Sequence, residues 1–240
     1  MSGNSDLDRR SPTPAVRTTS ETSEIAAFLA EARVRAPRTD GAEGRLIFAL
    51  DATMSRQPTW DAACALQGEM FRAAASIGGL AVQLVYFRGI DEARASPWVR
   101  DAAHLGRIMS GIACHGGLTQ IGRVLDHAAK EAAKKPVAAL AFVGDASEEA
   151  VDALCAKAGE LALRNTRAFM FLEGRDPAAE RAFREIARLT GGAMLPFDRG
   201  AAGELRALLG AVATFAAGGR KALEAAGTSA ARRLLADLRG

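Results

Sequence analysis

The chain has 240 residues, of which 49% are hydrophobic and 25% charged, and these proportions exclude a disordered chain and indicate a globular domain with a buried core. The formal net charge is only +3, and the residues after Gly218 carry the whole excess: Arg220, Lys221, Arg232, Arg233 and Arg239 against Glu224 and Asp237. Because aromatic residues make up only 5%, there is no platform for stacking bases, and we expect no nucleic-acid partner.

The three cysteines, Cys64, Cys114 and Cys155, form no CxxC pair, so the sequence predicts neither a disulfide framework nor a zinc site. No apolar stretch follows the N-terminal charges as it would in a signal peptide. No uncharged apolar run reaches the roughly 18 residues that a membrane span needs. We therefore expect a cytoplasmic protein with no membrane partner.

Residues 1–20 are rich in Ser, Thr, Pro and charged residues, which predicts a flexible N-terminal arm, because such a segment buries little apolar surface. In residues 21–43, the apolar side chains of Ile25, Phe28 and Leu29 recur at helical spacing. This pattern predicts one amphipathic N-terminal helix ahead of the main domain.

Between residues 44 and 217, short apolar runs alternate with longer helical patterns, which is typical of βαβ units and a mostly parallel sheet. The nearly continuous apolar character of the runs indicates strands that are covered on both faces. The expected strands are 45–50, 80–87, 137–144, 166–173 and 193–197. The expected helices are 59–77, 101–112, 121–134, 148–164, 177–189 and 201–217.

The segment ARASPWV, residues 93–99, interrupts this alternation. Its proline and its position soon after a strand predict an edge strand that runs antiparallel to the others. The expected fold class is therefore α/β: a doubly wound, Rossmann-like, mostly parallel six-stranded sheet with one antiparallel edge strand and helices on both faces. Residues 218–240 are expected to form a basic, helical C-terminal tail.

Two carboxylates directly follow expected core strands. Asp51 comes after RLIFAL, and Asp145 comes after VAALAFVG. In an open parallel sheet, ligands bind beyond the carboxyl ends of the strands, so both side chains are expected in one crevice if the two strands are neighbours. Two acids brought together need a cation or a shared proton to relieve their repulsion.

Hydroxyl side chains surround these acids in the sequence. DATMS places Thr53 and Ser55 at alternate positions after Asp51, and the loop CHGGLTQIG adds Thr119. Carboxylate and hydroxyl oxygens without sulfur or imidazole suit a hard cation. We therefore expect a magnesium site, with manganese or calcium as alternatives.

DATMS resembles the DxSxS motif of the metal-ion-dependent adhesion site (MIDAS) in von Willebrand factor A (VWA) domains of the bacterial, intracellular type. In that family a threonine from a glycine-bearing loop and an aspartate after a core strand complete the site, and these correspond to Thr119 and Asp145. The sequence departs from the family pattern in three places, which leave each oxygen ligand present: Thr53 replaces the usual serine, Leu118 separates the glycine pair from Thr119, and Ala146 stands where glycine often follows the aspartate.

The resemblance implies a function. Thr53, Ser55 and Thr119 would contact the metal directly, and Asp51 and Asp145 would act largely through bound water. An open coordination position would then accept an Asp or Glu carboxylate from a partner protein. The resemblance also suggests an adaptor or co-chaperone of an AAA+ ATPase, and no enzymatic activity.

Three other interpretations stay open. An aspartate after a strand can simply cap the next helix, and Thr119 or Ser147 can do the same. The site can also be degenerate, leaving a scaffold that does not depend on metal. A magnesium-dependent phosphohydrolase with Asp51 as nucleophile is the enzymatic alternative, but its usual second acid is replaced by Thr53.

Three residues near the site are secondary candidates. We expect no catalytic role for His115 and a free buried thiol at Cys114; the alternatives are that His115 acts near the metal and that Cys114 is a redox thiol. We expect Trp60 and Trp98 to be packing residues; the alternative is that Trp60, which follows the DATMS loop, frames a partner surface.

Overall fold

The computed structural model describes residues 43–53, 57–75, 77, 79–198 and 201–238. The chain divides into two compact units, Met1–Arg35 and Ala36–Gly240. The predicted arm 1–20 and almost all of the predicted helical segment 21–43 lie outside the described residues. The fold is therefore that of the second unit.

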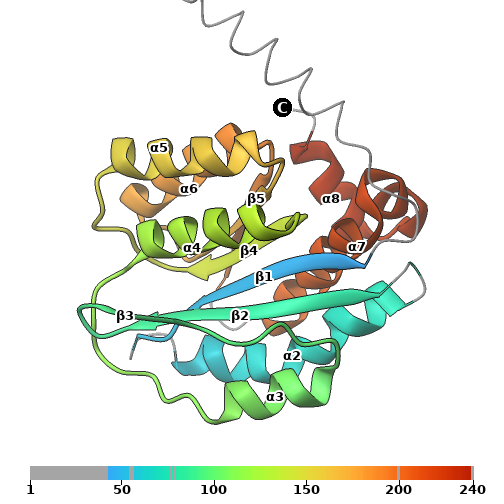
Figure 1. The fold of residues 1–240 in the computed structure, drawn as a ribbon, viewed down its shortest axis with the longest axis horizontal. Helices are drawn as coiled ribbons and strands as arrows, with labels where there is room; N and C mark the ends of the chain where they lie inside the picture. Colours follow the sequence, from blue (N-terminus) through green and yellow to red (C-terminus); the bar gives the residue numbers. More distant parts are fainter. Residues whose placement is uncertain (1–42, 54–56, 76, 78, 199–200, 239–240) are drawn as a thin grey trace, which may run out of the picture. The chain divides into compact units, whose positions relative to one another are not determined.

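Strands and helices alternate along the described chain (Figure 1). In chain order the elements are β1 (Gly44–Asp51), α2 (Gln57–Ala75), β2 (Leu80–Arg88), β3 (Glu92–Ala95), α3 (Ala102–Ser110), α4 (Ile121–Lys134), β4 (Ala139–Gly144), α5 (Val151–Leu163), β5 (Arg167–Glu173), α6 (Pro177–Thr190), β6 (Ala193–Phe197), α7 (Ala202–Ala226) and α8 (Ser229–Asp237).

The strands form one six-stranded sheet in the order β3-β2-β1-β4-β5-β6. All neighbouring pairs are parallel except β2 and β3, which are antiparallel. The strand order reverses its direction at β1, so the connections leave β1 and β4 toward opposite faces. This is the predicted fold class, and the prediction is confirmed.

Both faces of the sheet are covered by helices, as β1 illustrates. Leu46, Phe48 and Leu50 point into a core shared with α2, α3 and α7, whereas Ile47 and Ala49 point into a core shared with α4, α5 and α6. In Figure 1 the three helices of the second core lie together along one side of the sheet. A strand that is buried on both faces explains the nearly continuous apolar sequence of β1.

Local sequence signals fix both ends of α6. The Asp176 carboxylate accepts a hydrogen bond from the Ala179 amide at 2.7 Å and caps α6, which then starts at Pro177. At the other end Gly191 adopts a left-handed conformation with φ of 65°. The helix therefore begins and ends within a residue of its predicted bounds.

Two elements differ from the expectation. β3 is shorter than the predicted strand, because Pro97 lacks an amide donor and only the single bridge between Val82 and Val99 continues the pairing. α7 continues past residue 217 to Ala226, with a kink at Gly219, where φ is 68°. Among the described residues, no helix is both long and apolar enough to cross a membrane.

Candidate functional site

The acids expected to face each other lie at the same edge of the sheet. β1 and β4 are neighbours and parallel, with Leu50 opposite Val143. Asp51 is the last residue of β1 and is only 2% exposed, and Asp145 follows the end of β4 directly and is partly buried. The structure thus brings the ends of these two strands together at the carboxyl edge, between connections that leave for opposite faces.

The loop after β1 holds Thr53 beside Asp51. The Thr53 amide donates to Asp51 Oδ1 at 2.8 Å, and the Thr53 residue is buried. The Ala52 amide donates to the Phe87 carbonyl at 2.9 Å, and the Ala52 carbonyl accepts from the His115 amide at 3.0 Å. The loop is therefore fixed between β2 and the segment that leads to Thr119. Ser55 lies outside the described residues.

The segment before Thr119 is fixed to the end of β2. The Leu118 amide donates to the Gly89 carbonyl at 3.0 Å. A Cβ atom at Gly117 would lie 2.1 Å from the Gly89 oxygen, so this close approach requires glycine. The glycine pair of CHGGLT thus allows the loop to pack against β2, and it brings Thr119 to the carboxyl edge.

Thr119 is held by Glu148, a residue that the sequence analysis treated only as the start of a helix. The Thr119 hydroxyl donates to Glu148 Oε2 at 2.6 Å, and the Thr119 amide donates to the same oxygen at 3.2 Å. The Glu148 amide in turn donates to Thr119 Oγ1 at 3.4 Å. A hydroxyl has one proton and two lone pairs, so a second lone pair of Thr119 is left for a cation.

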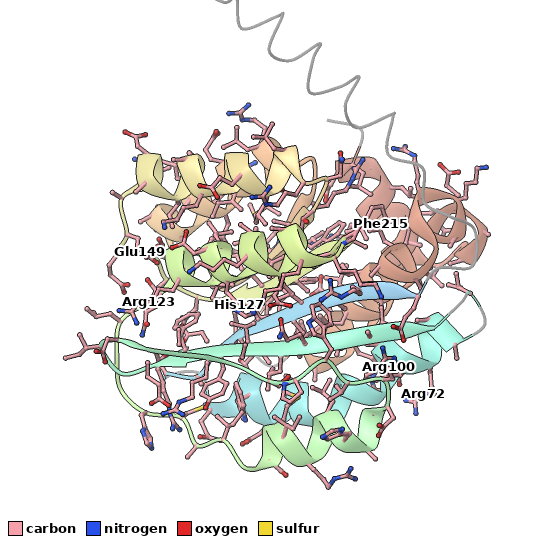
Figure 2. The ribbon with its side chains drawn as sticks, viewed as in Figure 1. Arg72, Arg100, Arg123, His127, Glu149 and Phe215 are labelled. Carbon is pink, nitrogen blue, oxygen red and sulfur yellow. The ribbon has the colours of Figure 1, made fainter. Side chains whose placement is uncertain are left out.

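The neighbouring Glu149 caps the start of α4. Its carboxylate accepts from the Ile121 amide and, at 3.0 Å, from the Gly122 amide (Figure 2). Burial raises the pKa of Glu149, while these backbone hydrogen bonds act in the opposite direction. Glu148 and Glu149 together tie the loop after β4 to the loop and helix that follow β3 and α3.

Two polar atoms close to these loops lack partners. The hydroxyl of Ser147, two residues after Asp145, and the Oε1 atom of Gln120, next to Thr119, are buried without a hydrogen-bond partner among the described residues. Buried polar atoms are normally satisfied, so each such atom needs an explanation, which can be water or an ion. Their positions agree with an oxygen-lined site at this edge.

A further acid at the carboxyl edge is already engaged. Glu173, the last residue of β5, is buried and accepts a hydrogen bond from the Thr59 hydroxyl in the first turn of α2. This pair was not predicted from the sequence. The position of Glu173 at the end of a strand was a signal in the sequence, but its partner Thr59 lies 114 positions away along the chain.

The donor chemistry fits a hard cation. Within the described part of the chain, no three His, Cys, Asp or Glu side chains come together in a way that could hold a metal ion. The candidate set is of another kind, because it combines two carboxylates with hydroxyl oxygens. Such oxygens suit magnesium, manganese or calcium better than a soft metal.

The secondary candidates fall into two groups. His115 is exposed, and its amide helps to fix the Thr53 loop. Cys114 is buried in the core below that loop. Trp60 is a packing residue, as expected, and the alternative that it frames a partner surface is wrong: this side chain is 2% exposed and packs edge-to-face against Tyr86, with ring centroids 6.2 Å apart.

No family model matches the sequence, and no curated protein matches it. Solved structures do match the fold. A von Willebrand factor type A protein from Catenulispora acidiphila has a TM-score of 0.62 at 17% identity, over 73% of this chain and 43% of that chain. The chain thus spans less than half of that protein.

Two more solved structures share the fold. The SpRpn10 VWA domain has a TM-score of 0.52 at 12% identity, over 67% of this chain and 90% of that domain. Proximal thread matrix protein 1 from the mussel byssus, with a zinc-occupied MIDAS motif, has a TM-score of 0.55 at 14% identity, over 72% of this chain and 45% of that one. At these identities the comparisons show the fold: the chain folds as a VWA domain, as the motif resemblance implied.

Proposed function

We propose that the chain is a metal-dependent protein-binding module, in which Asp51, Thr53, Ser55, Thr119 and Asp145 hold a divalent cation. The observation that carries the proposal is the juxtaposition of Asp51 and Asp145 at the ends of neighbouring parallel strands. Magnesium is the ion we favour, with manganese or calcium as alternatives. A bound ion would supply the positive charge that attracts a carboxylate from the partner.

The residues of this chain prepare the site for such an ion. The Thr53 amide orients the Asp51 carboxylate, and Glu148 orients the Thr119 hydroxyl. Because the Thr119 hydroxyl donates its hydrogen bond to Glu148, the oxygen can present a lone pair to the ion. The mutual repulsion of two carboxylates at one edge also favours a cation between them.

The partner in this proposal is a protein that presents an Asp or Glu side chain. The mussel byssus protein supports a divalent ion in this fold, since its MIDAS motif is described as occupied by zinc. The motif resemblance adds the narrower proposal of an adaptor or co-chaperone for an AAA+ ATPase in the cytoplasm. Such a partner involves neither nucleic acid nor membrane.

We also propose that the chain performs no covalent chemistry. A phosphohydrolase using Asp51 as nucleophile would need a second acid two residues later to protonate the leaving group, and Thr53 occupies that position. Metal-dependent hydrolysis of an aryl phosphate that is lost in Asp51→Asn would contradict this part of the proposal.

Thermal unfolding in EDTA, and then with magnesium, manganese or calcium, tests the metal site. A ligand specific for the native state stabilises it by about 2.7 kcal/mol at a hundredfold excess over Kd. For a domain of this size we expect a rise of roughly 5–10 °C in the unfolding midpoint. The shift should be absent in Asp145→Ala.

Asp152→Ala is the matched control, because Asp152 is an exposed acid in the first turn of α5. It should keep the full shift. An equal shift in all three proteins would mean non-specific ion binding, and no shift in the wild type would favour a scaffold. A capture experiment on the immobilised chain would then identify the partner. We expect a protein that is retained in magnesium, is released by EDTA and is not retained by Asp145→Ala. Replacing the acidic residue of that partner should also abolish its binding.

A further inference from the structure

A groove runs between the edge strand β3 and the helix α4, away from the acids of the proposed metal site. It has a volume of about 240 Å³, and its lining comes from these two elements and from β2: Val85, Ala93, Arg94, Ala95, Arg123, Asp126, His127 and Lys130. Figure 2 shows Arg123 and His127 along α4, between this helix and the strands β2 and β3. The β3 side of the groove is apolar and leaves room for a ligand, because Ala93 and Ala95 carry only methyl side chains.

The outer edge of β3 offers backbone groups to this groove. The Ser96 amide donates to the Leu84 carbonyl at 2.8 Å, and Arg94 lies opposite Tyr86. Hydrogen-bonded pairs alternate along an antiparallel ladder, so the backbone groups of Ala93 and Ala95 point away from β2. Among the described residues, no strand pairs with this outer edge. It can therefore accept another extended chain.

The helix side of the groove is positively charged. Arg123 and Lys130 are exposed; Arg123 donates to the backbone carbonyl of Asp91, and its charge is not paired with a carboxylate among the described ion pairs. Asp126, between them, is neutralised by Lys157, whose Nζ atom lies 2.5 Å from Asp126 Oδ2. The His127 ring lies 2.9 Å from Gln83 Oε1, and burial lowers the pKa of His127, which favours the uncharged ring.

We propose that this groove binds an extended, acidic segment of a partner polypeptide, which adds to the sheet as a strand beside β3. Alternate side chains of an added strand point to the same face. Every second side chain would therefore lie beside those of Ala93 and Ala95, on the same face of the sheet, where an acidic group reaches Arg123 or Lys130. The segment that fits best has acidic residues at alternate positions.

The lining favours a polypeptide over a nucleic acid. The nearest tryptophan, Trp98, is not available for stacking a base, because the Arg45 guanidinium lies 3.8 Å from the centre of its ring. The Trp98 Nε1 atom also donates to Glu131 Oε2 at 2.8 Å. An edge strand with an apolar floor recognises the backbone and alternate side chains of a peptide.

A fluorescein-labelled peptide of alternating glutamate and valine is the probe, and its fluorescence anisotropy is measured as the whole chain is added in EDTA. EDTA removes any contribution of the metal site, so this test is independent of the proposed function. We expect saturable binding that a peptide of alternating lysine and valine does not reproduce. In amide-exchange experiments, the bound peptide should protect the amides of Ala93 and Ala95 more than those of β6.

Two variants separate charge from strand pairing. Arg123→Glu combined with Lys130→Glu should weaken binding about tenfold or more, because two exposed attractions become repulsions. Ala95→Pro removes an outward amide and leaves the β2–β3 ladder intact, so it should weaken binding several-fold without unfolding the chain. Arg181→Glu, at an exposed position on α6, should change nothing.

Several outcomes would overturn the proposal. They are equal binding of the lysine peptide, unchanged affinity in both groove variants, or displacement of the peptide by a single-stranded oligonucleotide. A dimer that excludes the peptide and dissociates in Ala95→Pro would instead assign the edge to a second copy of the chain. Circular dichroism of each variant excludes misfolding as the cause of a loss.

Discussion

The buried polar groups at the amino edge of the parallel strands are arranged differently from those at the carboxyl edge. At the amino edge, Arg45 forms an ion pair with Glu131 at 3.3 Å and donates to the Lys135 carbonyl at 2.5 Å. The hydroxyl of Thr166 donates to the Val137 carbonyl at 2.9 Å, and that of Thr190 accepts from the Ala168 amide at 3.0 Å. The polar groups at this edge satisfy one another.

At the carboxyl edge the groups are arranged differently. Asp51 and Asp145 end neighbouring strands, and the Ser147 hydroxyl is buried without a partner among the described residues. The Asp51 carboxylate accepts from the Thr53 amide, so the edges differ in two points: two carboxylates lie at neighbouring strand ends here, and a buried hydroxyl lacks a partner among the described residues. The comparison indicates that substitutions at the amino edge should affect stability, and those at the carboxyl edge should affect binding.

The largest effect is expected at the amino edge, from Arg45→Ala. The side chains of Arg45 and Glu131 are 8% and 10% exposed, and removing one partner of a buried pair is strongly destabilising. Lys134 and Trp98 still contact Glu131, so we expect a loss of about 3 kcal/mol, at the low end of the range. Urea unfolding measures it. The metal-induced shift should persist in the variant, and a loss below about 1 kcal/mol would contradict the comparison.

Asp51→Asn should leave the stability in EDTA nearly unchanged and remove the stabilisation by metal. Asparagine keeps an oxygen that can accept from the Thr53 amide but removes one negative charge. In EDTA the unfolding midpoint should stay close to that of the wild type or rise slightly, because repulsion with Asp145 is relieved. With metal, the expected gain of about 2.7 kcal/mol should disappear. A marked loss of stability in EDTA would assign Asp51 a structural role instead.

Much of this contrast could be predicted from the sequence. The apolar runs and the acids that follow them are local features, and they placed Asp51 and Asp145 at the ends of β1 and β4. The neighbouring position of the two strands follows from the doubly wound order. The antiparallel β3 was recognisable because Pro97 restricts a strand to the edge of a sheet.

The supporting contacts could not be predicted in this way. The helix predicted over 148–164 begins instead at Val151, so Glu148 and Glu149 lie in the preceding loop and reach Thr119 and α4. These contacts join residues about 28 positions apart, and helical periodicity carries no information on them.

Glu148→Gln sharpens the comparison at the carboxyl edge. Outer groups that orient metal ligands typically change metal affinity 10–100-fold when they are mutated. Because the glutamine oxygen can still accept from Thr119 but lacks the charge, we expect a decrease of about tenfold in magnesium affinity. Isothermal titration calorimetry measures it, and stability in EDTA should be unchanged. Asp152→Ala is again the control, and an unchanged affinity would mean that Glu148 only packs against the loop.

The smallest effects come from removing one hydroxyl at each edge. Thr166→Val deletes the hydrogen bond to the Val137 carbonyl and leaves a buried acceptor unpaired, so it should destabilise the fold by about 1–2 kcal/mol. Ser147→Ala deletes a hydroxyl that has no partner among the described residues, so the change in EDTA should stay within about 0.5 kcal/mol. The two variants, measured side by side by urea unfolding, compare the edges directly. Equal losses would mean that the Ser147 hydroxyl is satisfied by water, and that the two edges differ less than their contacts indicate.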